Sequence, residues 1–263
     1  MKYIINADDF GKSEDVNKAI IHCIEERVIN STTIMANGLA LPSAATYARS
    51  NPQISYGVHL VIDEMESLTK SMILFDNGII DENGFFIRGA IRNVKIDKAL
   101  KEAIYTEWCA QVDRLLSLGI SINHIDSHHH VHTIPALFGI LKRVSQRYNL
   151  KTVRNTMWKP ITLKLNSPKM NDTKREYCSN NSVSKVSFFA KVRNTILDTY
   201  LYFRFKYQFD TTDMFTSVWI FLHNEEKISK CKYVKKIELM CHPGHPSYQK
   251  ETDALLYSKL LKN

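Results

Sequence analysis

The clearest evidence for the architecture and chemistry of this chain lies in the stretch Ile120-Ser-Ile-Asn-His-Ile-Asp-Ser-His-His-His-Val-His132. Its first part, 120–126, predicts a strand that runs straight into a cluster of histidines. Five of the ten histidines in the chain fall between His124 and His132. Histidine is the commonest neutral metal ligand and titrates nearest to neutral pH. This density therefore predicts metal-assisted or acid–base chemistry rather than a solvated polar loop.

On either side of this stretch, predicted strands alternate with predicted helices, a pattern typical of a parallel sheet in an α/β protein. No internal repeat, low-complexity tract or linker is visible, so we expect one domain over residues 1–263. The further strands are expected at 3–7, 31–36, 55–60, 151–154 and 236–241, and the helices at 13–28, 43–49, 97–118 and 135–148.

Four other segments carry weaker patterns. Residues 63–95 contain turn signals and are expected to form loops and short pieces that cover a site. Residues 160–183 are polar and without pattern, and 217–222 is ambiguous. Residues 187–205 predict a helix whose aromatic stripe faces the core rather than a membrane surface.

The composition is that of an ordinary soluble globular protein, with 44% apolar and 24% charged residues. No apolar run approaches the roughly 20 residues that span a bilayer. The apolar stretch at the N-terminus is far too short for a signal peptide, so a cytoplasmic protein is expected. The five cysteines are scattered and form no C-x-x-C pair, which favours reduced thiols over disulfides or a cysteine-rich zinc site.

The net charge of +8 is compatible with nucleic acid, but no nucleic-acid motif accompanies it. The basic residues are spread along the chain, so a solvated basic surface is favoured. We therefore expect no nucleic-acid partner.

The unusual polar residues share one position relative to the predicted strands. In barrels and open α/β sheets, loops that leave the C-terminal ends of the strands converge, and active sites form there. Each of these residues lies at or just past such an end: Asp8, Asp9, His59, Asp126, His128, Arg154 and His242.

Two adjacent aspartates, Asp8 and Asp9, would normally face opposite sides of a strand. At a strand end, where Gly11 lets the chain curl, both can point into the same space. One can then bind a cation while the other accepts a proton from water. The alternative is an ordinary helix cap, which would need one aspartate rather than two.

In the histidine stretch, His124, Asp126, His128, His130 and His132 share parity and would lie on one face of an extended chain. If the strand ends near Asp126, a turn could instead bring His128 and His132 together. Some of these side chains are expected to orient the ligands rather than bind the metal. An open catalytic site needs three protein ligands, which one Asp and two His provide. His59 alone would be read as a buried core histidine, and it is a candidate ligand only if the other proposed ligands lie beside it.

Four blocks of this sequence together resemble the YdjC-like carbohydrate deacetylases, a family that includes chitooligosaccharide deacetylases. The resemblance implies a distorted (β/α) barrel similar to that of the NodB-type polysaccharide deacetylases. It also implies removal of an N-acetyl group from an amino sugar, with release of acetate, by a water that a divalent metal activates. The blocks are Asn6-Ala-Asp-Asp-Phe-Gly11, Gly57-Val-His-Leu60, His124-Ile-Asp-Ser-His-His-His-Val-His132 and Met240-Cys-His-Pro-Gly244.

Carried over residue by residue, the resemblance implies three metal ligands, a general base, a general acid and an arginine near the catalytic aspartate. One metal ion is expected, either Mg²⁺ or Zn²⁺, and Mn²⁺ and Co²⁺ also suit such a ligand set. The matching residues are Asp9, His59 and His128 for the metal, Asp8 as the base, His242 as the acid and Arg154 as the arginine.

Two other functions stay open. A phosphoesterase would often use two metals about 3.5–4 Å apart with bridging carboxylates, whereas this cluster is rich in histidine. A non-catalytic barrel that binds glycans would not need the full set of titratable residues. Residues 160–230 resemble the family least, so the sequence does not choose between a free chitooligosaccharide and an N-acetyl sugar in a glycan or lipid-linked intermediate. A homodimer is compatible with the family.

Overall fold

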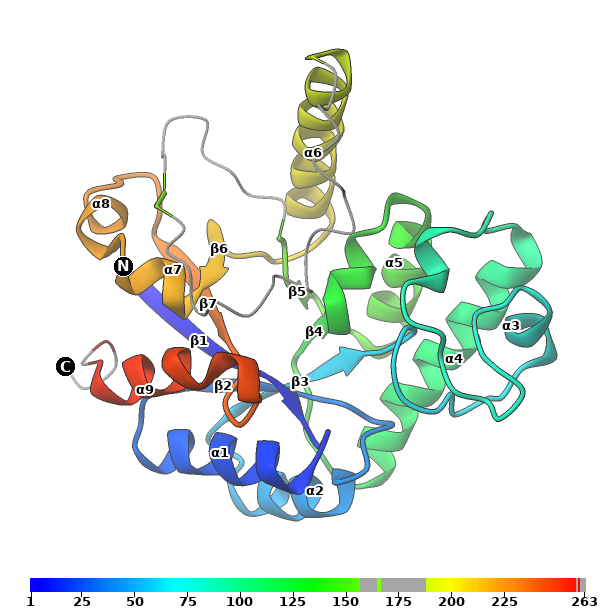
Figure 1. Ribbon diagram of the computed structural model, residues 1–263, viewed down its shortest axis with the longest axis horizontal. Coiled ribbons are helices and arrows are strands. Elements are labelled where there is room, and N and C mark those ends of the chain that lie inside the picture. The colour runs from blue at the N-terminus through cyan, green and yellow to red at the C-terminus, as the bar shows by residue number, and fades with distance from the viewer. Residues whose placement is uncertain (157–164, 167–187, 259, 261–263) are drawn as a thin grey trace.

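The computed structural model describes residues 1–156, 165–166, 188–258 and 260, and in this part seven parallel strands form one curled sheet (Figure 1). The strand order is β5-β4-β3-β2-β1-β7-β6. The predicted α/β fold with a distorted barrel is confirmed. The strands are β1 (Lys2–Phe10), β2 (Ser31–Ile34), β3 (Ser55–Leu60), β4 (His124–Ser127), β5 (Thr152–Val153), β6 (Met214–Ser217) and β7 (Lys236–Cys241).

The two edges of the sheet approach each other through the chain that leads into β6. The backbone of Asp210 accepts a hydrogen bond from Val153 N (3.0 Å) and donates one to Lys151 O (2.9 Å). The sheet is therefore curled far enough for its concave side to enclose a space.

Helices follow most strands and cover the convex side of the sheet. Side chains cap two of the predicted helices: Ser13 accepts from Val16 N at the start of α1, and Asp97 accepts from Leu100 N at the start of α4. The helices are α1 (Glu14–Glu25), α2 (Leu41–Ser50), α3 (Met72–Asp76), α4 (Lys98–Ser117), α5 (Phe138–Tyr148), α6 (Phe188–Gln208), α7 (Val218–Leu222), α8 (Glu225–Ser229) and α9 (Gln249–Tyr257). Short 3₁₀ turns lie at Ala90–Arg92, His128–Thr133 (η2), Pro135–Leu137 and Pro246–Tyr248.

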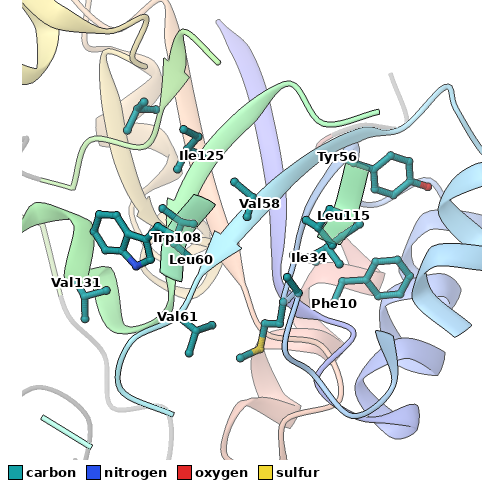
Figure 2. Packing of buried hydrophobic residues seen from close by; sticks show 14 of the residues in the cluster. Phe10, Ile34, Tyr56, Val58, Leu60, Val61, Trp108, Leu115, Ile125 and Val131 are labelled. Atoms are coloured by element: carbon teal, nitrogen blue, oxygen red, sulfur yellow. The ribbon is translucent and has the colours of Figure 1, made fainter. Parts of the chain in front are cut away.

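The convex side of the sheet carries the apolar core. Val58, Leu60 and Ile125 are fully buried there, near Trp108 and Leu115 of α4 (Figure 2). Because side chains alternate along a strand, the intervening residues face the concave side. There they are polar, unlike the branched aliphatic residues that fill most such barrels.

The concave side holds two layers of polar side chains, each joined by its own side-chain contacts. We call the layer nearer the N-terminal ends of the strands the lower layer and the next one the upper layer. Asn6 links them, because its amide donates to both Asp8 and Thr33. The lower layer consists of Asn6, Ser31 and His124, with Gly57 beneath the His124 ring, and the upper layer consists of Asp8, Thr33, His59 and Asp126.

Several predicted boundaries were wrong. The strand predicted at 120–126 starts at His124, and β1 extends to Phe10, so it includes both aspartates. β6 and α9 were not predicted, and the ambiguous segment 217–222 is mostly α7. Most of the polar segment 160–183 lies outside the described residues. The excursion 63–95 does consist of loops and short pieces.

The aromatic stripe predicted on α6 faces the core in part, among the side chains that the structure describes. Phe205 is fully buried, whereas Tyr200 and Phe203 are more than half exposed. Figure 1 shows that α6 extends beyond the sheet. Within the described residues, no helix has the length and apolar character needed to cross a membrane.

The described cysteines, Cys23, Cys109, Cys231 and Cys241, are all free thiols, and Cys178 lies outside the described residues. Burial raises the pKa of Cys241 well above its ordinary value. A thiol that stays protonated is a poor nucleophile, so Cys241 is not a nucleophile candidate despite its position beside His242.

Candidate metal and catalytic site

A backbone irregularity brings the two aspartates to one side of the sheet. The pairing of β1 with β2 shifts register between Ala7 and Phe10, and Asp9 has a positive φ of 71°. Asp tolerates this left-handed conformation better than most residues other than glycine. The expected curl is therefore made by Asp9 itself, before Gly11, and it turns both carboxylates toward the same space.

Two histidines from other segments meet Asp9 of β1: His59 of β3 and His128 of η2, the turn after β4. Asp9 Oδ1 lies 3.2 Å from His59 Nε2 and 2.9 Å from His128 Nδ1. All three residues are buried, and the three ligand atoms lie within 4.8 Å of one another. The structure thus brings together the three residues that the sequence analysis assigned to a metal.

His59 is oriented by contacts to the ring nitrogen that faces away from Asp9. Its Nδ1 lies 2.6 Å from Asp126 Oδ1 and 3.1 Å from Thr33 Oγ1, and the threonine hydroxyl also donates to Asp126. A carboxylate on the second nitrogen is the usual partner of a metal-binding histidine, because it fixes the ring and its tautomer. Asp126 therefore leaves His59 Nε2 available toward Asp9.

His128 has the same kind of support from a residue that the sequence analysis missed. Its Nε2 lies 2.6 Å from Glu64 Oε2, and Lys12 Nζ lies 3.0 Å from the other Glu64 oxygen. Glu64 follows β3 and Lys12 follows β1, so the strand-end rule that found the aspartates applies to both. Neither stands in a dense motif, which is why neither was noticed.

The charges of these groups depend on each other. Burial alone would raise the pKa of Asp9, but His128 and His59 outweigh burial and hold it well below its usual range. Burial lowers the pKa of His59, yet Asp126 and Asp9 outweigh it and raise that pKa to about 10. The pKa of His128 is also raised, because Asp9 and Glu64 outweigh burial. Each carboxylate therefore favours the protonated form of the ring beside it.

The donor chemistry of this group fits a divalent metal. One carboxylate and two imidazoles are suited to Zn²⁺ and its neighbours, and they leave positions open for water and substrate. Two other groups are close enough to hold an ion but fit less well. In Asp8, His59 and Asp126, a guanidinium already binds both carboxylates. In Glu64, His128 and His129, the glutamate is already paired with Lys12 and His129 Nδ1 with Asp63.

That guanidinium belongs to Arg154, just past β5. Its Nη1 and Nη2 donate to the two oxygens of Asp8 (2.6 and 2.7 Å), and Nη2 also lies 2.8 Å from Asp126 Oδ2. Its Nε donates to Glu238 Oε1 (2.6 Å) on β7. Because β5 and β1 are separated by three strands, these contacts cross the concave side of the sheet. Glu238 was not predicted, since it lies 84 residues from Arg154 in the chain.

His242 follows β7, beside β1. Its Nδ1 lies 3.8 Å from Glu251 Oε2 on α9, and its backbone N–H donates to the same oxygen (3.1 Å). The ring stacks on Tyr248 with centroids 4.6 Å apart. Burial lowers the pKa of His242, but Glu251, Asp8 and Asp9 outweigh it and raise that pKa. Glu251 was missed because α9 was not predicted.

The remaining histidines of the stretch take different directions, because the strand ends at Ser127 and the chain turns. His129 and His130 both have positive φ, at 50° and 56°. His129 Nδ1 lies 2.7 Å from Asp63, and His132 lies between Ser127 Oγ and the carbonyl of Arg154. The even-numbered residues from 124 to 132 therefore do not lie on one face, as they would in an extended chain.

Comparison with known proteins identifies the family of this chain. A family model described as YdjC-like protein matches residues 2–261. The chain belongs to this family. Its Asp9, His59 and His128 come from three of the four blocks that carried the resemblance.

The curated relatives considered next are both described as carbohydrate deacetylases. The chain is 39% identical over 148 residues to a "Carbohydrate deacetylase" of Geobacillus stearothermophilus, which is 56% of this chain and 57% of the relative. It is 41% identical over 150 residues to a "Carbohydrate deacetylase" of Vibrio campbellii (strain ATCC BAA-1116), with 57% of each chain covered. The matched part thus spans little more than half the length of these relatives.

A solved structure from Enterococcus faecalis V583, named for a suggested role in cellobiose-phosphate cleavage, has a similar fold. It superposes with a TM-score of 0.68 and 25% sequence identity, covering 99% of this chain and 92% of that one. The similarity in fold therefore extends well beyond the segment matched in the curated relatives.

Proposed function

We propose that this YdjC-like protein is a metal-dependent hydrolase that removes an N-acetyl group from an amino sugar or oligosaccharide and releases acetate. The observation that carries the proposal is the convergence of Asp9, His59 and His128 beside Asp8, which Arg154 holds by both oxygens. The description of the curated relatives as carbohydrate deacetylases supports the same reaction class.

Asp9, His59 and His128 would hold the metal, with Asp126 and Glu64 fixing the two rings. When bound, the ion would supply a Lewis acid that polarises the acetyl carbonyl and lowers the pKa of water toward neutrality. Mg²⁺, Zn²⁺, Mn²⁺ and Co²⁺ are all compatible with this ligand set.

Asp8 is suited to the role of general base. Arg154 and Asn6 together donate three hydrogen bonds to its carboxylate and fix its orientation beside Asp9. From there it would take the proton of the attacking water. Arg154 also contacts Asp126 and Glu238, so its positive charge is shared among three carboxylates rather than directed at Asp8 alone.

His242 is suited to the role of general acid. The leaving amine of an amide must be protonated as the C–N bond breaks, and a histidine can supply that proton near neutral pH. The raised pKa of His242 keeps the ring protonated to higher pH than an ordinary histidine. Glu251, whose carboxylate causes much of that shift, would hold the ring in place.

Phosphoester hydrolysis is the second candidate, because the group Glu64, His128 and His129 could hold another ion next to the first. The two functions differ in metal content. A deacetylase of the proposed kind would bind about one metal per chain, and a two-metal phosphoesterase about two.

The proposed function is tested by measuring acetate released from a panel of N-acetylated sugars, beginning with diacetylchitobiose. Each sugar is assayed with added Zn²⁺, Mg²⁺, Mn²⁺ or Co²⁺ and again with chelator. We expect release that depends on metal and is lost with chelator. Absence of release from every sugar by a chain with metal bound would contradict the deacetylase assignment, and phosphate release from a sugar phosphate would favour the alternative.

A further inference from the structure

One histidine of the cluster differs from the others in its hydrogen bonds. His124, His128, His129 and His132 each have at least one ring nitrogen within hydrogen-bond distance of a described partner. His130 has none in the part of the chain that the structure describes, and its Nδ1 is fully buried without a partner. A buried polar atom without a partner is unfavourable, so the fold holds this ring in place at a cost.

The backbone of His130 adds to that cost. The residue has φ 56° and ψ 31°, and the residue before it is also left-handed. Each such conformation is unfavourable for a non-glycine residue, and strain of this kind gathers at functional sites. Because of this left-handed turn, the His130 ring lies in a different position from the one it would have if β4 continued as an extended strand.

That place is over the concave side of the sheet. The His130 ring packs edge-on against Phe215 of β6, with ring centroids 5.4 Å apart, although β4 and β6 are not neighbours in the sheet. The guanidinium carbon of Arg154, which holds Asp8, lies 5.2 Å from the centre of the same Phe215 ring. His130 thus shares the Phe215 ring with Arg154, which holds the proposed base.

The two ring nitrogens of His130 differ in their surroundings. Nδ1 is fully buried without a partner, and the residue as a whole is part-exposed, so Nε2 is the ring nitrogen that we assign to a ligand. The surrounding polar groups exclude an anion as the natural ligand, because the charge of Arg154 is already outweighed by Asp8, Asp126 and Glu238. A hydroxyl can donate or accept a hydrogen bond, so it pairs with Nε2 whichever nitrogen carries the proton.

We propose that His130 binds a hydroxyl group of the sugar through Nε2 and so helps to select the substrate. This inference rests on the proposed function, since it places the sugar beside Asp8. The left-handed turn and the Phe215 contact hold the ring in readiness for that hydroxyl.

Two substitutions separate this role from a structural one. Asparagine reproduces the Nδ1 side of the ring and tolerates a positive φ, but it lacks a polar atom at Nε2. Glutamine places an amide near Nε2 but tolerates the backbone less well. The substrate role therefore predicts that His130→Asn is the harmful change and His130→Gln the mild one. A role in backbone conformation predicts the reverse.

The experiment measures binding of diacetylchitobiose by calorimetry to three metal-loaded proteins. The parent carries Asp8→Asn, which should slow turnover of the sugar by about two orders of magnitude or more, and the other two carry either His130→Asn or His130→Gln in addition. Loss of one hydrogen bond predicts a Kd about tenfold higher for His130→Asn. For His130→Gln we expect a Kd within about threefold of the parent. Thermal melting of each variant checks that it folds.

The outcomes distinguish the inference from the proposed function. Equal affinities in all three proteins, weaker binding in the His130→Gln variant alone, or no sugar binding at all would overturn the role of His130. Sugar binding with the expected order of affinities, but no acetate release by the wild-type chain, would support the role of His130 and contradict the deacetylase assignment.

Discussion

The two polar layers on the concave side of the sheet contain similar residues but have opposite electrostatics. His124 in the lower layer and His59 in the upper layer face the same side from neighbouring strands. Burial lowers the pKa of His124 to about 4, with the charge of Arg154 acting in the same direction. For His59, Asp126 and Asp9 outweigh burial and raise the pKa to about 10.

The difference comes from the neighbours rather than from the histidines. His124 contacts amide and hydroxyl groups of Asn123, Asn6 and Ser31, and its ring fills the space over Gly57, where an added Cβ would lie 2.5 Å away. Every carboxylate within hydrogen-bond distance of His59 belongs to the upper layer or to Asp9. A histidine becomes a candidate ligand where carboxylates surround it, and a packing group where they do not.

The lower layer also borders a cavity of about 400 Å³ near the N-terminal ends of the strands. Lys2, Lys236 and Thr212 line it together with His124 and Glu238. Both layers are therefore polar, and the upper layer is distinguished by its carboxylates and by the Asp9 bulge.

The largest difference between the layers is expected in metal binding. Asp9→Asn keeps a side chain that tolerates a positive φ but removes the charged ligand, so we expect metal affinity to fall by about a hundredfold or more, with loss of turnover. His124→Asn in the lower layer should leave metal affinity within about twofold. Calorimetric titration with Zn²⁺ measures both. Equal losses in the two variants would contradict the division into layers.

A smaller effect on binding but a large one on turnover is expected for Asp8→Asn. The amide keeps the shape of the side chain but cannot take a proton, so turnover should fall by about two orders of magnitude or more while metal stays bound. Acetate release and metal content are measured on the same samples. Full activity in this variant would exclude Asp8 as the base.

The pH profile should reveal the pair His242 and Glu251. If His242 acts in its protonated form, kcat/KM falls as pH rises through its pKa. Glu251 raises that pKa, so Glu251→Gln should move the alkaline limb of the profile to lower pH. Glu226→Gln, at an exposed carboxylate paired with Lys230, serves as the matched control and should leave the limb in place. An unmoved limb in a folded Glu251→Gln protein would contradict the role.

The smallest effect is expected on stability in the lower layer. The pKa of His124 is lower in the folded chain (about 4) than its ordinary value of 6.5, so the unfolded chain takes up a proton first as pH falls. His124 therefore stabilises the fold fully above pH 6.5 and loses that contribution between 6.5 and 4. Urea unfolding of His124→Asn should show a shallower loss over this range, by on the order of 1–3 kcal/mol. An identical pH slope in both proteins would contradict the low pKa.

Features of the molecule that depend on local sequence pattern could be predicted from the sequence. Strand ends located Asp8, Asp9, His59, His128, Arg154 and His242, and the structure places each of them at the C-terminal side of the sheet or just beyond it. Their roles stay predictions. The alternation of strands and helices predicted the fold class, which is confirmed.

Contacts between distant segments could not be predicted. Glu238 meets Arg154 across the sheet, and Glu251 meets His242 from a helix that lacked a clear pattern. Asp9 and His130 are left-handed because of the surrounding tertiary structure. Neither residue type by itself predicts that conformation. Parity in an extended chain grouped His130 with His128, whereas the turn at Ser127 separates them.

The central claim is that one divalent metal binds among Asp9, His59 and His128, and anomalous diffraction from crystals grown with Zn²⁺ or Mn²⁺ tests it most directly. We expect one strong anomalous peak per chain in contact with Asp9, His59 Nε2 and His128 Nδ1. A peak held instead by Glu64 and His129, or two peaks of comparable strength, would contradict the claim.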